Sequence, residues 1–232
     1  GVVASVIPVA SAAVLSGNMP WRETAADAPP QAFRSGSGAP GFFTATETAF
    51  ITAAVARLIP KDELGPGAVE AGVPDFIDNQ LAGDYGKATR WYMQGPWANG
   101  EATQGYQTRM TPAALYRTAI REIDEAVAKA HNGALFTKLE AADQELWLAR
   151  LEKGDVHLPT ADAKTFFTML LQNTKEGFWS DPIYGGNRDM VGWKLIGFPG
   201  ARYDHRDFVS HHGERYPLPP VGISGRRDWK TG

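Results

Sequence analysis

Apolar residues in the middle of the chain recur at spacings of three and four, which is typical of helices that bury one face. The first of these segments follows Thr44 and Glu47, which have the spacing of a helix-opening capping box, and it ends at Pro60. Four further segments show the same spacing, with turn residues between them. The sequence therefore predicts five helices, over about 45–59, 73–82, 112–131, 141–153 and 161–176.

Residues at the ends of these segments support the predicted bounds. Thr111 and Pro112 provide an N-cap and a first-turn proline for the helix with the clearest pattern, and the Asn-Gly pair at 132–133 provides its stop. For the last helix, Thr160 is the expected cap and Gly177 the expected end. We expect the apolar faces to form one core, which includes Phe50, Ile51, Phe76, Ile77, Leu115, Tyr116, Ile120, Leu148, Leu151, Phe166, Phe167 and Leu170.

The helical pattern disappears after Trp179. Residues 181–200 include five glycines, two prolines and three aromatic residues, a mixture that disfavours a regular helix or strand. We predict a shaped loop there. Tyr, Trp and Arg dominate protein interfaces, so we interpret this loop as a surface that docks a partner. The alternative is a C-terminal coil that packs on the helices of its own chain. The candidate docking residues are Tyr184, Gly185, Gly186, Asn187, Arg188, Asp189, Trp193, Lys194, Phe198, Pro199 and Gly200.

The predicted organisation is a small all-α bundle of about five helices with long irregular arms at both ends. Residues 44–180 form the helical domain, 18–43 a Pro/Gly-rich arm and 181–232 an irregular C-terminal arm that docks a partner. No alternation of strands and helices predicts a sheet. Arms of this length bury too little apolar surface alone to offset their ordering entropy, so we expect a partner to cover them.

Residues 1–17 are uncharged, apolar and rich in Ala and Val, which is typical of the hydrophobic part of an export signal. The run is short for a transmembrane helix, which needs about 20 apolar residues. We expect the segment to belong to a longer precursor and to dock on a partner or a membrane interface. A buried N-terminal helix of the domain itself is the alternative.

Composition excludes several kinds of chemistry. The chain has no cysteine, so disulfides, a thiolate nucleophile, an iron–sulfur cluster and covalently attached haem are all excluded. A formal net charge of −3 and a single short basic pair at 226–227 give no footprint for nucleic acid. We therefore expect no nucleic-acid partner.

Side chains that could carry chemistry are present but poorly arranged for it. His205, His211 and His212 follow one another on an irregular segment without the i, i+4 spacing of a helical metal site, so we assign no metal ligand. Acidic groups such as 122–125 and 140–143 fall on polar helix faces, where we expect them to be solvated and paired along the helix. We expect no catalytic residue and no cofactor in this chain.

The combination of Asp181-Pro-Ile-Tyr-Gly-Gly-Asn-Arg-Asp189 with Gly192-Trp-Lys-Leu-Ile-Gly-Phe-Pro-Gly200 resembles the gluconate 2-dehydrogenase subunit 3 family. The resemblance extends over about residues 42–229 and includes Arg57-Leu-Ile-Pro60 and Gly72-Val-Pro-Asp75. It implies the small, non-catalytic subunit of a three-subunit dehydrogenase of the bacterial periplasm, associated with the cytoplasmic membrane.

The resemblance also implies the partners and their cofactors. A large subunit would hold FAD and oxidise gluconate, and a multi-haem cytochrome c subunit would carry electrons to ubiquinone. The small subunit would stabilise the flavoprotein and assist its twin-arginine export, and residues 1–17 would be the apolar part of that signal. The alternative is a free-standing periplasmic protein that binds or hydrolyses carbohydrate through the aromatic loop at 85–106.

Overall fold

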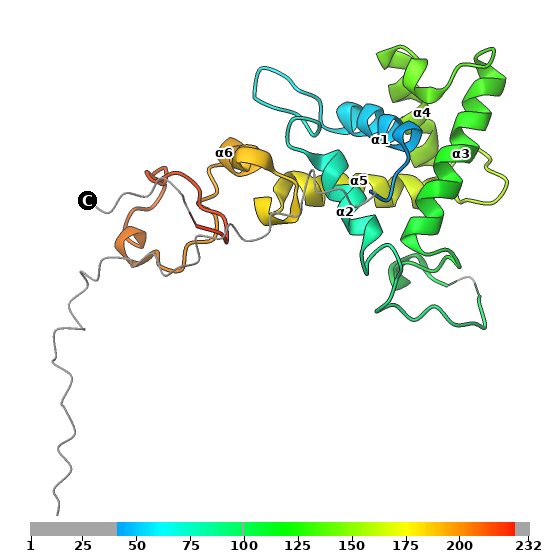
Figure 1. The fold of residues 1–232 in the computed structure, drawn as a ribbon. Coiled ribbons are helices and arrows are strands. Elements are labelled where there is room, and N and C mark those ends of the chain that lie inside the picture. Colours follow the sequence, from blue (N-terminus) through cyan, green and yellow to red (C-terminus); the bar gives the residue numbers. More distant parts are fainter. Residues whose placement is uncertain (1–40, 99, 226–232) are drawn as a thin grey trace, which may run out of the picture.

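The computed structural model describes residues 41–98 and 100–225, and in this part of the chain it contains six α-helices and no strand. The interpretation of residues 1–17 as an export-type segment, and most of the arm at 18–43, lie outside the described residues. Figure 1 shows the helices of residues 45–179 gathered in one body and the helix at 191–196 to one side of it. The bounds are α1 Ala45–Leu58, α2 Val73–Ala82, α3 Pro112–Ala130, α4 Ala141–Lys153, α5 Ala163–Trp179 and α6 Val191–Ile196. The predicted all-α fold is confirmed.

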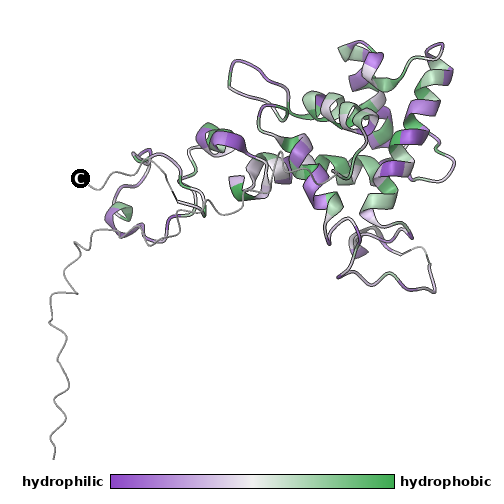
Figure 2. Cartoon of the chain, viewed as in Figure 1, coloured by the Kyte–Doolittle hydropathy of each residue, from purple (hydrophilic) through white to green (hydrophobic). Residues whose placement is uncertain are grey.

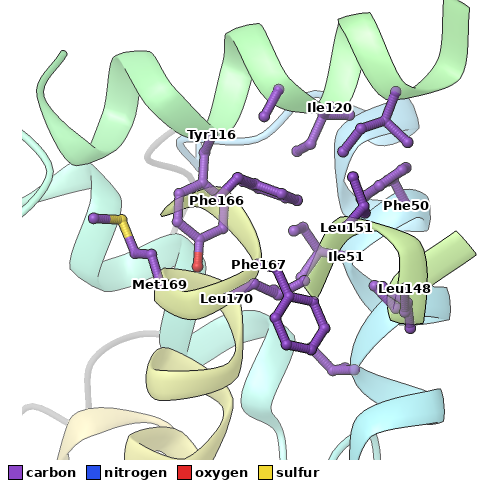
Figure 3. Close-up of a cluster of buried hydrophobic side chains, with 14 of the residues drawn as sticks. Phe50, Ile51, Tyr116, Ile120, Leu148, Leu151, Phe166, Phe167, Met169 and Leu170 are labelled. Carbon is purple, nitrogen blue, oxygen red and sulfur yellow. The ribbon is translucent and has the colours of Figure 1, made fainter. Parts of the chain in front are cut away.

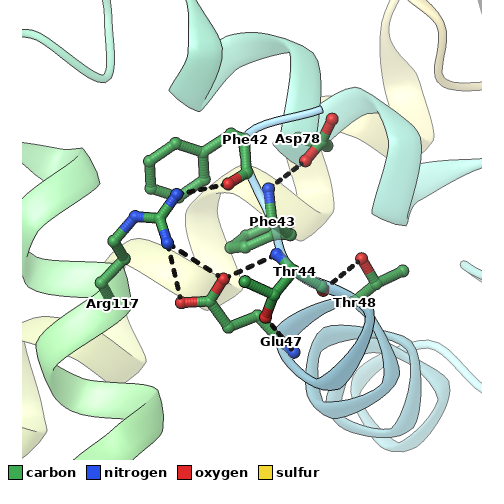
Figure 4. Close-up of polar contacts among 7 residues, drawn as sticks. All are labelled: Phe42, Phe43, Thr44, Glu47, Thr48, Asp78 and Arg117. Atoms are coloured by element: carbon green, nitrogen blue, oxygen red, sulfur yellow. Dashed lines mark hydrogen bonds and ion pairs between the residues drawn. The ribbon is translucent and has the colours of Figure 1, made fainter. Parts of the chain in front are cut away.

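The first helix begins as its sequence predicts. The Thr44 side chain accepts a hydrogen bond from the Glu47 amide, and the Glu47 carboxylate accepts one from the Thr44 amide, which completes a capping box (Figure 4). Arg117 of α3 bonds the same carboxylate, and Asp78 of α2 accepts the Phe43 amide at 2.7 Å. The start of α1 is therefore bonded to both α2 and α3.

Helix α5 is the centre of the body, because it contacts each of the other five helices. Its buried side chains include Phe166, Phe167, Met169, Leu170 and Phe178, which cover more than one face of the helix. Aromatic rings from three other elements meet Phe166 and one another in the core, at centroid distances of 4.7 to 6.5 Å. Figure 3 shows this cluster, and Figure 2 shows hydrophobic and hydrophilic residues interleaved along the helices around it.

The predicted ends of the last helix of the body were wrong at both termini. The cap is Asp162, which accepts the Thr165 amide at 2.7 Å, rather than Thr160. Gly177 does not end the helix, which continues to Trp179. A Cβ at Gly177 would lie 2.8 Å from the Phe76 ring, so this glycine serves the close approach of α2 and α5.

One acidic residue that was expected on a solvated helix face is buried. Glu122 is only 2% exposed and accepts the backbone N–H groups of Thr160 and Ala161, each at 3.0 Å. Burial by itself would raise the pKa of Glu122, but these amides and the guanidinium of Arg121 lower the pKa below its ordinary value. The carboxylate therefore bonds α3 to the turn that precedes α5.

The segment after α5 differs from the predicted irregular loop because it contains α6 and short 3-10 turns at 182–184 and 188–190. In Figure 1, this segment is coloured orange to red, and it leaves the body at the C-terminal end of α5. In the described ranges, 41–98 and 100–225, no helix is long and apolar enough to cross a membrane.

Candidate partner-docking surface

Asn187 is the centre of the glycine-rich motif, and it lies fully inside the protein. Its side-chain amide donates to the Ser180 carbonyl at 2.8 Å, and its side-chain oxygen accepts the Gly192 amide at 2.9 Å. The backbone of Asn187 has φ 46°, a left-handed conformation that asparagine tolerates better than most residues. Asn187 therefore bonds the end of α5 to the start of α6, and its side chain is not exposed on the surface of this chain.

The glycines of the motif allow the chain to pass very close to α5. A Cβ at Gly186 would lie 2.2 Å from the Gly177 carbonyl oxygen, and a Cβ at Gly192 would lie 2.4 Å from the carbonyl oxygen of Phe178. No side chain fits at these distances, so only glycine permits this packing. Gly185, with φ 94°, ends the turn at 182–184.

Arg188 connects the same segment to α2. Its amide donates to the Ala71 carbonyl at 3.0 Å, and its guanidinium forms an ion pair with Asp75 in the first turn of α2. The guanidinium lies against Gly72, where a Cβ would be 2.6 Å from its nitrogen. Arg188 therefore joins the glycine-rich motif to Gly72 and Asp75 at the start of α2. The adjacent Asp189 is exposed.

Trp193 is 6% exposed, so it is part of the interior and not a free interface side chain. Its indole N–H donates to the Trp179 carbonyl at 2.8 Å, and its ring meets Phe198 edge to face at a centroid distance of 5.2 Å. Pro199 and Gly200 form a bridge with Val221, in which the Val221 amide donates to the Pro199 carbonyl at 3.2 Å.

The motif therefore has two parts with different environments. One part packs on the end of α5 through Gly186, Asn187 and Trp193, and we call this contact the joint. Other residues of the same run reach the surface. Exposed fractions are 44% for Tyr184, 48% for Leu195, 63% for Ile196 and 44% for Phe198. Lys194 is also exposed. Leu195 and Ile196 were not among the candidate docking residues, because α6 was not predicted and its outer face could not be recognised.

Large exposed apolar side chains concentrate in this part of the protein. Nine of the thirteen in the described chain lie between Trp179 and Ile223, although that interval is about a quarter of it. We call Leu195, Ile196, Phe198 and Leu218 the C-terminal apolar surface. Exposed apolar side chains gathered in one region are typical of protein–protein or membrane contact sites.

Three aromatic rings of the loop at 85–106 are half-buried against the core. Trp91 meets Tyr85 and Tyr106 at centroid distances of 5.7 and 5.0 Å, and the Tyr85 hydroxyl bonds Asn173 of α5. Burial raises the pKa of Tyr85 and of Tyr106. These rings pack on one another and on the core, so a sugar could contact only part of each ring. Tyr92, which is 82% exposed, is the exception.

The histidines of the C-terminal segment contact different neighbours. His211 lies 2.9 Å from the Glu214 carboxylate, and the His205 ring packs on Tyr216. Among the residues that the structure places, no group of three or more His, Asp or Glu side chains could hold a metal ion.

Taken together, the geometry defines a small all-α protein whose glycine-rich C-terminal motif packs on the end of its central helix. The chain belongs to the gluconate 2-dehydrogenase subunit 3 family, whose model matches residues 45–200. The match covers the body, the joint and α6, and it confirms the resemblance seen in the sequence. No curated protein and no solved structure matches the chain.

Proposed function

We propose that this chain is the non-catalytic small subunit of a periplasmic gluconate 2-dehydrogenase complex, in which it binds and stabilises an FAD-containing large subunit. Membership of the subunit 3 family supports a role beside other subunits. The proposal that the chain docks on the large subunit rests on the C-terminal apolar surface. There the side chains of Leu195, Ile196 and Phe198 are each close to half exposed or more. Nine of the thirteen large exposed apolar side chains of the described residues lie in this part of the chain, and such a concentration is typical of a contact site for a partner.

The remaining parts of the proposal concern the assembly. The large subunit oxidises gluconate with FAD, and a multi-haem cytochrome c subunit passes the electrons to ubiquinone at the cytoplasmic membrane. The small subunit accompanies the folded flavoprotein through twin-arginine export. The residues of this chain supply burial for the flavoprotein surface, and none of them takes part in the oxidation.

A co-purification experiment tests the docking role. We would tag the full chain, express it with its flavoprotein and cytochrome partners, and compare Leu195→Ala/Ile196→Ala with the unchanged protein. Truncating side chains at the centre of an interface costs on the order of 2 kcal/mol, so the double variant should retain less than about a tenth of the flavoprotein. Flavin and haem c absorption of the eluted complex is the readout.

The matched control is Tyr92→Ala/Leu146→Ala, which removes two apolar side chains that are 82% and 58% exposed on the body. This control should elute with the same flavin absorption as the unchanged protein. If the unchanged chain brings no flavoprotein, the proposed function is wrong. If the double variant behaves like the control, the function stands and the choice of surface is wrong.

A further inference from the structure

A groove lies beside α6 in the C-terminal segment. Its volume is about 380 Å³, and its walls are the end of α6 with residues 197–198 on one side and residues 215–220 on the other. The side chains that matter for recognition are Trp193, Lys194, Phe198, Arg215, Tyr216 and Leu218. The family match ends at Gly200, so the second wall lies outside it.

The two walls are held together by hydrogen bonds to backbone carbonyls. The Ala201 amide donates to the Val221 carbonyl at 2.7 Å, and the Arg202 guanidinium donates to the Pro219 carbonyl at 2.8 Å. A Cβ at Gly200 would lie 2.1 Å from the Val221 carbonyl oxygen, so glycine is needed for this approach. The groove is therefore formed before a ligand arrives, which reduces the entropy lost on binding.

The charges that line the groove are all positive. Lys194 and Arg215 are exposed, the lining contains no acidic side chain, and neither cation forms an ion pair within the described ranges. A second groove, between α1 and α3, differs in this respect. There Arg117 pairs with Glu47 at 3.3 Å and Arg121 with Glu125 at 2.9 Å, so its charges are satisfied within the chain.

The shape of the groove favours recognition through side chains. Three prolines in the wall at 215–220 have no N–H group, so an extended peptide could not pair with that wall as it would with a strand. Phe198 and Leu218 are each 44% exposed and offer apolar contact instead. The fitting ligand thus combines an apolar side chain with a carboxylate.

We infer that this groove binds an acidic, apolar peptide segment of the FAD-containing subunit, with its carboxylates beside Lys194 and Arg215. The inference rests on the proposed function and adds the chemistry of the partner segment. Phe198 and Leu218 belong both to the groove and to the C-terminal apolar surface, so one partner can cover the two together. Opposite charges across such a contact raise the association rate and exclude wrong partners.

Charge reversal tests the inference. Lys194→Glu/Arg215→Glu should weaken binding to the isolated flavoprotein subunit by about tenfold or more at low salt, and Lys194→Gln/Arg215→Gln by about threefold. Because salt screens these charges, the difference between the reversed and unchanged proteins should shrink as ionic strength rises. Titration of the full-length chain against the flavoprotein in a calorimeter gives both affinities.

The control for charge is Lys129→Glu/Lys164→Glu, which alters the net charge equally at two exposed positions of the body. Equal affinities of this control and the groove reversal would overturn the inference while the proposed function stood, because the unchanged chain would still bind. Failure of the unchanged chain to bind would instead refute the proposed function.

A photo-cross-link identifies the occupant directly. Benzoylphenylalanine placed at Leu218 in the assembled complex should join a flavoprotein peptide that carries Asp or Glu next to an apolar residue. A cross-link to a second copy of this chain, to the cytochrome subunit or to a peptide without a carboxylate would contradict the inference. Absence of any cross-link in an assembled complex would contradict it as well.

Discussion

The helical body, residues 41–180, and the C-terminal segment, residues 181–225, are held in shape by different forces. The body buries a continuous apolar core that includes Phe50, Tyr116, Phe136 and Phe166, all with 0% exposure. In the segment only Gly186, Asn187, Gly192, Trp193, Gly200 and Val221 are buried. Three of these six are glycines, which contribute almost no apolar area.

This difference means that the segment is placed by hydrogen bonds and close backbone contacts, whereas the body is stabilised by the hydrophobic effect. Burial of a Phe or Leu side chain contributes about 1.5 to 3 kcal/mol, and a typical hydrogen bond contributes about 0.5 to 1.5 kcal/mol net. The segment should therefore open locally at a lower free energy than the body unfolds. Because the segment opens at a lower free energy than the body, a partner that covers it should stabilise it more than it stabilises the body.

The largest expected effect is in the core of the body. Phe166→Ala removes a ring that lies 5.4 Å from Tyr116 and 6.5 Å from Phe50, and it leaves a cavity at the centre of the fold. The free energy of unfolding should fall by about 3 to 5 kcal/mol. Urea denaturation followed by circular dichroism measures this change.

Tyr203→Ala is the control for that substitution, because it truncates an aromatic ring in the C-terminal segment that is 93% exposed. It should alter the unfolding free energy by less than about 0.5 kcal/mol. If the two variants had similar stability, the contrast between body and segment would be wrong.

The intermediate effect concerns the joint. Gly186→Ala places a Cβ 2.2 Å from the Gly177 carbonyl, and the resulting displacement should cost about 1 to 3 kcal/mol. We expect this cost to appear as faster proteolysis within 181–225 and as reduced amide protection of Gly192, with the main unfolding transition of the body unchanged. Limited proteolysis with mass spectrometry separates these outcomes.

Gly83→Ala is a suitable comparison, since its Cβ would meet nothing closer than 3.6 Å. Its digestion pattern should match that of the unchanged protein. Cooperative loss of the whole fold in Gly186→Ala would show that the body and the segment form a single unit.

The smallest expected effect is the pH dependence of the body. The pKa of Glu122 is lower in the folded state than in the unfolded state. The ionised carboxylate therefore contributes fully to the free energy of unfolding above the unfolded pKa, near 4.3, and this contribution is lost as the pH falls through the folded pKa. Glu122→Gln replaces a charged acceptor by a neutral one and should cost about 1 kcal/mol at pH 7. The difference should disappear in acid, where the native carboxyl is protonated.

Denaturation midpoints of both proteins between pH 3 and pH 7 check this expectation. Glu125→Gln, at an exposed position one turn away, is the control and should follow the unchanged protein closely. A constant difference between Glu122→Gln and the unchanged protein across the whole range would mean that the charge of Glu122 does not bond the turn before α5.

The sequence alone was sufficient for four of the five helices of the body. Spacing of apolar residues and local capping chemistry act within one or two helical turns, so they predicted α1, α2, α3 and α4 closely, and the bounds Ala141–Lys153 were predicted correctly. The family was also recognisable from the short motifs Gly-Gly-Asn-Arg and Gly-Trp-Lys, and both lie within the residues that its model matches.

Only the tertiary structure decided which side chains of the C-terminal motif are inside. Asn187 and Trp193 are buried because α5 extends past Gly177 and supplies the carbonyls of Ser180 and Trp179 that they bond. The Phe76 ring of α2 makes Gly177 necessary, and the Gly177 carbonyl makes Gly186 necessary, and no local pattern contains either contact. Contacts between residues distant in the chain set burial, and burial determines which part of a motif builds the fold and which part remains exposed to a partner.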